Sequence, residues 1–187
     1  MEWDLPSRGL AAAILASLLA AAAPAQAKVF YSQKEALALA FPDAERVERR
    51  TELLDDAQAR AVEQLARAEL PSRLVTLYTG YRGGEVLGHA VIEQHTVRTQ
   101  PEAFLVVMTR DGRVRSIRVL AFYEPEEYLP PERWLRQFDE RPLDDRLRLE
   151  GEIHGIAGAT LSARAVTAGV RRALAVYQVL VAAPAAR

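Results

Sequence analysis

The sequence predicts one α+β domain, built from antiparallel sheet hairpins with helices before and after them in the chain. Strand-like runs follow one another through the middle of the sequence, and tight-turn signals at Gly83-Gly84 and Asp111-Gly112 separate them. The last helix-like run keeps its apolar residues near one stripe from Leu161 onward. Consecutive strands joined by short turns favour an antiparallel sheet over alternating β and α units.

The segment before the sheet is predicted to contain two helices and one strand. Ser32 and Glu35 form the capping box of a short helix that Pro42 ends. Residues 45–53 are charged and tolerant of β structure, so they are expected to form a strand. An alanine-rich helix is expected from Asp55 to Pro71.

The sheet itself is predicted from runs of alternating or continuous apolar residues. Val114, Ile117 and Val119 mark a half-buried strand. The four expected strands are 73–81, 84–97, 104–110 and 113–120.

The remainder of the chain is predicted to be a long loop followed by one long helix. Residues 121–138 are rich in aromatic residues and prolines, and Pro131 suits the first turn of a short helix that carries Trp134 and Phe138. Glycines at 151, 155 and 158 then make a flexible loop. The helix from Leu161 follows it.

Composition excludes several classes of site. The 187 residues include no cysteine, so a disulfide, a thiolate zinc site, an iron–sulfur cluster and a cysteine nucleophile are excluded. His89, His95 and His154 are too scattered to suggest a histidine-built metal site, so no metal is expected. The two histidines of the second sheet strand, His89 and His95, are expected at the surface or half-buried.

The balance of acidic and basic residues does not indicate binding to nucleic acid, and no such partner is expected. The chain has 24 basic and 25 acidic residues and a net charge of −1. Without residues 1–27, the counts become 24 − 1 = 23 and 25 − 2 = 23. A neutral balance lacks the excess of positive charge that phosphate backbones attract.

Residues 1–27 are predicted to be a signal peptide that is cleaved after Ala27. The apolar run Gly9–Ala23 is shorter than the roughly 20 residues that span a bilayer, and Ala25 and Ala27 suit a signal peptidase. Export, for example to a periplasm, follows from this interpretation. The alternative is an uncleaved N-terminal membrane anchor, and a buried core helix is disfavoured because alanines bury little apolar area.

The loop before the last helix is the most informative part of the sequence. It reads Gly155-Ile156-Ala157-Gly158-Ala159-Thr160-Leu161-Ser162. Glycines let a backbone approach a ligand closely, and a helix N-terminus favours an anion such as phosphate. Thr160 or Ser162 is expected to cap the helix and touch that ligand. The plainer alternative is that Thr160 is an N-cap and Gly158 relieves a tight loop. The segment is no nucleotide P-loop, because the lysine after the last glycine is missing, and its glycine spacing is not that of a Rossmann fingerprint.

The stretch Gly158-Ala159-Thr160-Leu161-Ser162 is similar to the flavinylation motif of the FMN-binding domain family. That family includes the covalent flavin subunits of Rnf-type and sodium-pumping NADH:quinone reductase complexes, and exported single-domain proteins. The resemblance implies FMN joined through its phosphate to the hydroxyl of Thr160. Similar segments at 84–90, 111–120 and 124–138 extend the resemblance over about 74–180.

The leader pattern and the extent of the resemblance together give the expected domain boundaries. They are a signal peptide over 1–27, an N-terminal extension over 28–73, an FMN-binding domain over 74–180 and a frayed tail over 181–187. Two positions depart from the family pattern, since His154 stands for the usual Asp and Ala157 for the usual Ser or Thr. A lost hydroxyl contact at Ala157 costs about 1 kcal/mol, and backbone N–H groups can compensate for it.

The resemblance also implies roles for side chains around the flavin. Tyr123, Trp134 and Phe138 are candidates to pack against the ring, with core packing as the alternative. Glu124 is a candidate acceptor for the flavin or its ribityl chain, with a solvated loop charge as the alternative. His154 is a candidate phosphate contact.

The function implied is that of an exported flavoprotein electron carrier, with no pocket for a small organic substrate. Its expected partners are an exported flavin transferase that uses FAD and Mg²⁺, a membrane-bound electron donor, and a second redox protein or external acceptor. Two alternatives stay open. One is a non-redox exported ligand-binding or sensor module of the same fold without flavin, and the other is a reductase that acts directly on a soluble acceptor.

Overall fold

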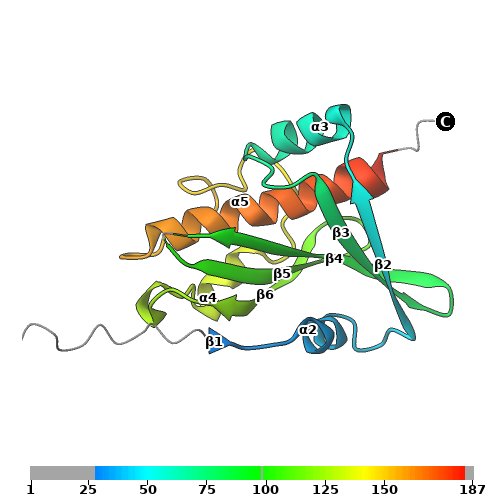
Figure 1. Cartoon of the computed structure of the whole chain (residues 1–187), viewed down its shortest axis with the longest axis horizontal. Helices are drawn as coiled ribbons and strands as arrows, with labels where there is room; N and C mark the ends of the chain where they lie inside the picture. Colours follow the sequence, from blue (N-terminus) through cyan, green and yellow to red (C-terminus); the bar gives the residue numbers. More distant parts are fainter. Residues whose placement is uncertain (1–27, 98, 184–187) are drawn as a thin grey trace, which may run out of the picture.

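The computed structural model describes residues 28–97 and 99–183. The predicted signal peptide and the last residues of the predicted tail lie outside the described residues. Within them, the predicted α+β architecture is confirmed, with one antiparallel sheet and its helices on both faces (Figure 1).

The sheet has six strands in the order β1-β6-β5-β4-β3-β2, and each neighbouring pair is antiparallel. The Asp111-Gly112 turn joins β5 to β6 as predicted, and the Gly83-Gly84 turn joins β3 to β4. The strands are β1 (Lys28–Val29), β2 (Arg46–Leu53), β3 (Leu74–Arg82), β4 (Glu85–Thr96), β5 (Pro101–Met108) and β6 (Val114–Phe122).

One face of the sheet is covered by α5 (Thr160–Tyr177), with α3 (Asp56–Ala66) beside it (Figure 1). The apolar stripe predicted for the last helix packs on this face. Gly169 brings the middle of α5 so close to β5 that a Cβ atom there would lie 2.5 Å from Cζ of Phe104. The larger of the two hydrophobic clusters lies in this layer.

The opposite face carries α2 (Gln33–Ala40), which has the predicted capping box of Ser32 and Glu35. Its buried residues Ala36 and Ala40 pack into the second hydrophobic cluster with Leu105 of β5. The helix ends at Phe41, directly before Pro42, as the sequence predicts.

The second predicted helix is shorter than expected. It ends at Ala66, because Arg67 adopts a left-handed conformation with φ 52°, and does not run to Pro71. Its last carbonyl groups are held by Arg171 of α5, which is 5% exposed. Arg171 Nε donates to the carbonyl oxygen of Ala66 at 2.6 Å, and Nη2 donates to that of Leu65 at 3.0 Å. A buried arginine from a distant segment therefore caps α3.

Arg171 also fixes the loop after the short helices. Its Nη1 donates to the carbonyl oxygens of Asp144 at 2.7 Å and Leu147 at 2.9 Å. The short helices are η1 (Glu126–Tyr128), α4 (Glu132–Leu135) and η2 (Arg136–Phe138), and η3 (Gln178–Ala182) continues α5.

The expectation that His89 lies at the surface or half-buried is wrong. His89 is 5% exposed because α5 covers its face of the sheet, and its ring lies 5.2 Å from that of Tyr177. Its Nδ1 is 3.0 Å from Oγ1 of Thr79 on the neighbouring strand. His95 lies on the same strand with its Nε2 2.8 Å from Oε1 of Glu102, and it is half-buried as expected.

The segment Thr160–Ala182 has the length and mean hydropathy of a membrane span. However, 61% of its most apolar window is buried inside the fold, as in the core helix of a folded domain.

Candidate functional site

The candidate site lies at the N-terminus of α5. Thr160 is the first helical residue, and the N-cap is Ala159, which has no side-chain acceptor. The first main-chain bond of the helix runs from the N–H of Ala163 to the carbonyl oxygen of Ala159 at 3.0 Å. The expectation that Thr160 or Ser162 caps the helix is therefore wrong, and the first turn keeps its amide groups free of any capping side chain.

A pocket of about 270 Å³ opens beside this helix end. It brings together all five residues of the predicted motif and adds one that the motif does not contain, Tyr128 of η1. The lining residues are Tyr128, Gly158, Ala159, Thr160, Leu161 and Ser162. In the sequence, Tyr128 belongs to the aromatic and proline-rich stretch 121–138 and to the segment 124–138 of the family resemblance, and neither predicts that it contacts the motif.

The residues of this pocket fit a phosphate group. Thr160 is exposed, so its hydroxyl is accessible, whereas Ser162 is 1% exposed and its Oγ has no hydrogen-bond partner. Uncapped amides at a helix N-terminus attract anions through their N–H groups and the helix dipole. Gly158 has φ +80° with open space around it, so only its backbone faces the pocket. The site can hold a phosphoryl group on the hydroxyl of Thr160.

The loop that leads to Thr160 is held by the side chains of Trp134 and Gln137, which we call the loop clamp. Trp134 Nε1 donates to the carbonyl oxygen of His154 at 2.6 Å. The N–H of His154 donates to Oε1 of Gln137 at 2.9 Å. Both main-chain groups of His154 are thus satisfied by the segment α4–η2, and the position of the loop is fixed relative to the sheet.

Further contacts hold the loop upstream of the clamp. Ile153 is fully buried. Glu152 pairs with Arg141 and with Arg146, whose Nη1 lies 3.0 Å from its Oε1. The loop is therefore anchored up to the main chain of His154, and exposed residues such as Gly155, Ala157 and Gly158 follow it.

Several predicted site residues do not line the pocket beside Thr160. Trp134 is 6% exposed and packs edge-on against Phe138 at 5.4 Å, so core packing describes both residues here. Tyr123 is half-buried at the end of β6, and the exposed His154 lies outside the pocket lining.

Glu124 is buried, at 7% exposed, so the alternative of a solvated loop charge is wrong. Its Oε1 accepts hydrogen bonds from the N–H groups of Thr99 at 2.8 Å and Gln100 at 3.0 Å. Glu124 therefore holds the turn between β4 and β5.

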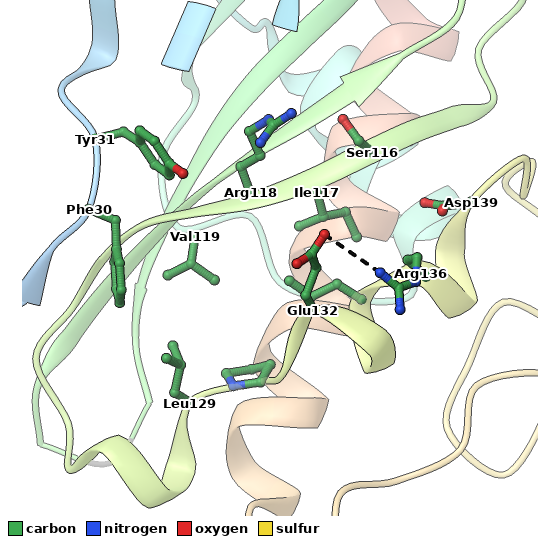
Figure 2. Close-up of a pocket in the computed structure, with 12 residues that line it drawn as sticks. Phe30, Tyr31, Ser116, Ile117, Arg118, Val119, Leu129, Glu132, Arg136 and Asp139 are labelled. Carbon is green, nitrogen blue, oxygen red and sulfur yellow. Dashed lines mark ion pairs between the residues drawn. The ribbon is translucent and has the colours of Figure 1, made fainter. Parts of the chain in front are cut away.

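A second, larger pocket of about 410 Å³ lies beside β6, and Ser116, Ile117 and Val119 of that strand line it (Figure 2). Leu129 and Pro130, which follow Tyr128 in the chain, line it together with Phe30 and Tyr31. Its rim carries Arg118, whose buried Nε has no hydrogen-bond partner, and an ion pair between Glu132 and Arg136 at 3.6 Å. Consecutive residues therefore contribute to the two pockets, Tyr128 to the smaller one and Leu129 and Pro130 to the larger one.

The family model of the FMN-binding domain matches residues 100–175. This range starts just before β5 and ends within α5, and it contains the pocket beside Thr160. The resemblance is therefore confirmed over this part of the chain, and the match supports FMN as the cofactor. No curated protein matches the chain.

Proposed function

We propose that this protein is an exported electron carrier whose FMN is attached through a phosphoester to Thr160. The observation that carries the proposal is the exposed Thr160 hydroxyl at the uncapped N-terminus of α5, inside the segment that matches the FMN-binding domain. An anion-binding helix end and an accessible hydroxyl on the same residue are what a phosphoester needs.

The attachment balances as a phosphoryl-group transfer. The hydroxyl oxygen of Thr160 attacks the FMN-side phosphorus of FAD, and the bond between the two phosphates breaks. AMP leaves, and the hydroxyl proton passes to a base of an exported flavin transferase. Mg²⁺ held by the transferase would supply charge neutralisation for the phosphates. The main-chain amides of the first turn of α5 stabilise the phosphoester product.

Bound FMN supplies one-electron or two-electron transfer. The chain has to hold the cofactor and orient it. Tyr128 is the aromatic side chain that shares the pocket with Thr160, so we assign it, in place of Trp134, as the contact for the flavin ring. Leu161 is 47% exposed beside Thr160 and offers a second apolar contact.

Export follows from the predicted leader, and covalent attachment suits an exported carrier because released FMN would be lost. We propose that the mature chain begins at Lys28, the first residue of β1. The partners would be a membrane-bound electron donor and a second redox protein or external acceptor. N-terminal sequencing of exported protein tests the leader, and a chain that retains Met1 would favour the membrane anchor.

The attachment is tested by co-expression of the full chain with an exported flavin transferase. Intact mass should rise by one FMN less one water, and the yellow colour should survive denaturation. A colourless protein of unchanged mass would contradict the proposal.

A non-redox ligand-binding module is the second candidate. The observation in its favour is that the larger pocket lies along β6 and does not include Thr160. Under this alternative, ligands bind between Phe30, Tyr31 and Pro130 whether or not flavin is present (Figure 2).

A further inference from the structure

The side of β6 that faces away from β5 is paired by the chain itself at its two ends. At one end, the N–H groups of Phe30 and Tyr31 donate to the carbonyl oxygen of Leu120, at 2.8 and 3.3 Å. At the other end, Val114 exchanges two main-chain hydrogen bonds with residues 140–141, at 3.0 and 2.7 Å. The strand therefore accepts main-chain partners on this side wherever the chain supplies them.

The middle of the same side is open. Among the described residues, no main-chain hydrogen bond reaches residues 115–119 from this side, because β1 pairs only with Ala121 and Phe122. Irregularities in the pairing with β5 lie before and after residues 116–119, which themselves pair regularly. Bulges help to protect a sheet edge from further pairing, and this stretch has none. We call residues 116–119 the open edge of β6.

The larger pocket lies on this open edge, because all four of its residues line the pocket. Figure 2 shows Ser116 and Arg118 on one side of the strand and Ile117 and Val119 on the other, as the alternation of side chains in a strand requires. A hollow that touches both sides of a strand borders its edge, where every second residue presents an N–H and a C=O group. Donors and acceptors at this spacing are matched by another extended polypeptide.

The opposite edge of the sheet, β2, is protected in a way that the open edge is not. Its exposed residues carry both charges, and they pair along the strand, Arg46 with Glu48 at 3.0 Å and Arg50 with Glu52 at 2.6 Å. Charged side chains on an edge strand hinder the addition of another strand. The open edge of β6 has a single charged residue, Arg118, so it lacks this protection.

Arg118 indicates which side chain an added strand would carry. Its Nε is buried without a hydrogen-bond partner, and the side chain forms no ion pair within the described part of the chain. A carboxylate is the acceptor that fits a guanidinium group best, and it would satisfy this donor. On the other side of the strand, Ile117 and Val119 face Leu129 and Pro130 across the pocket and favour apolar side chains.

We propose that the open edge of β6 is a docking site to which an extended, acidic segment of a partner protein adds as a further strand. Alternate side chains of that segment place a carboxylate on Arg118 and apolar groups against Ile117 and Val119. The four residues of the edge span about 13 Å, so the contact is short and reversible. Docking requires no flavin, so the inference is independent of the attachment at Thr160.

The probe is a fluorescein-labelled peptide with blocked ends and the sequence valine, glutamate, valine, glutamate, valine, titrated against the full-length protein and followed by fluorescence anisotropy. Arg118→Met should weaken binding about tenfold and Arg118→Lys about threefold, since lysine keeps the charge but not the forked geometry. The matched control is Arg49→Met on the exposed edge strand β2, which makes the same change of charge and should bind as the wild type does.

Changes in the peptide separate the two kinds of contact. Glutamine in place of both glutamates should weaken binding to the wild type about tenfold and cause no further loss with Arg118→Met, because the two changes remove the same interaction. Methylation of the main-chain nitrogens tests the strand pairing. The N–H groups of alternate residues point to opposite sides of a strand, so methylation of one alternate set should abolish binding and methylation of the other set should not.

A stability measurement keeps the result for Arg118 interpretable. Arg118→Met removes a buried donor that has no partner, so its melting temperature should equal or exceed that of the wild type. A lower melting temperature would show that Arg118 is already used inside the fold, and it would contradict the proposal.

Four other results would overturn the inference. They are no binding of the peptide to the wild type, equal binding to Arg118→Met, equal effects of the two methylation patterns, and competition by free glutarate at the same concentration as the unlabelled peptide. The last result would mean that the pocket takes a small anion. Self-association of the wild type that the peptide does not reverse would also overturn it, since a second copy would then occupy the edge.

Discussion

The indole N–H of Trp134 donates a hydrogen bond to the main-chain carbonyl oxygen of His154 at 2.6 Å. This contact joins a short helix to the loop that leads to Thr160, and its two residues are 20 positions apart in the chain. It gives Trp134 a different role from the ring contact that the sequence suggests. The tryptophan holds the loop that leads to Thr160, together with Gln137.

Replacing Trp134 with phenylalanine keeps an aromatic ring in the core but removes the donor. Because the carbonyl oxygen of His154 loses its partner, we expect the free energy of unfolding to fall by about 1 kcal/mol and flavinylation to slow. Urea unfolding and a time course of FMN incorporation measure the two effects. Tyr123→Phe, which changes an aromatic residue outside the clamp, is the control. An unchanged time course for Trp134→Phe would show that the clamp does not position the loop.

Replacing Thr160 with alanine should abolish covalent flavin, because the nucleophilic oxygen is lost. Thr160 makes no capping hydrogen bond, so the free energy of unfolding should change by no more than about 0.5 kcal/mol. Fluorescence of the protein band on a denaturing gel reports the attachment, and Thr160→Ser should retain it. A fluorescent band in Thr160→Ala would rule out Thr160 as the only attachment site, and Ser162 would be the next residue to test.

Replacing His154 with aspartate restores the residue that is usual in the family. The side chain of His154 is exposed and only its main chain is clamped, so the substitution should leave the loop in place. We expect faster or more complete flavinylation by a generic flavin transferase, because the acid that the family presents is present again. Parallel time courses under the same conditions measure this. Slower modification of His154→Asp would mean that the histidine belongs to this protein's own motif.

Because of His89, the free energy of unfolding should decrease as the pH falls into the mildly acidic range. Burial lowers the pKa of His89 below its ordinary value of 6.5. The imidazole is therefore harder to protonate in the folded state than in the unfolded state. Above pH 6.5 both states are neutral, and the contribution is constant. As the pH falls below 6.5, the unfolded state takes up the proton first, and stability decreases until the folded pKa is reached. The free energy of unfolding of the wild type should therefore fall over this range more steeply than that of His89→Gln. Equal slopes would contradict the assignment.

Arg171 should be the most costly single polar residue to lose. Arg171→Met leaves the carbonyl oxygens of Leu65, Ala66, Asp144 and Leu147 without their donor. We expect the free energy of unfolding to fall by about 3 kcal/mol or more. Arg164→Met on the exposed side of the same helix is the control and should stay within about 0.5 kcal/mol. Chemical denaturation of both variants decides the point.

Local patterns predicted most elements of the fold. The capping box at Ser32, the turn at Asp111-Gly112 and the apolar stripe of the last helix act over a few residues, so they can be recognised in the sequence alone. The end of α3 could not be predicted in this way. It depends on Arg171, a residue more than 100 positions away in the chain, and pattern rules do not include such a contact.

In the site too, local features could be predicted from the sequence, whereas contacts between distant segments could not. Five contiguous residues of the motif line one pocket, because neighbours in sequence at a helix start must be neighbours in space. The roles of Trp134, Glu124 and Tyr128 were not predictable, since each depends on a packing partner from another segment. An aromatic residue or a carboxylate in a loop looks the same in sequence whether it contacts a ligand or a distant backbone group.

The close approach of α5 to the sheet at Gly169 affects the position of the N-terminal end of the helix. The helix lies close to Phe104 of the sheet there, and Thr160 lies nine residues away, or about 13 Å along the axis. A tilt of a few degrees about that contact would displace the N-terminal end of the helix by roughly 1 Å, a distance that matters for catalytic alignment. A Cβ atom at position 169 would lie 2.5 Å from Cζ of Phe104, so either the ring or the helix would have to move. A change in the core at mid-helix would therefore alter the position of Thr160, the proposed attachment residue, from nine residues away.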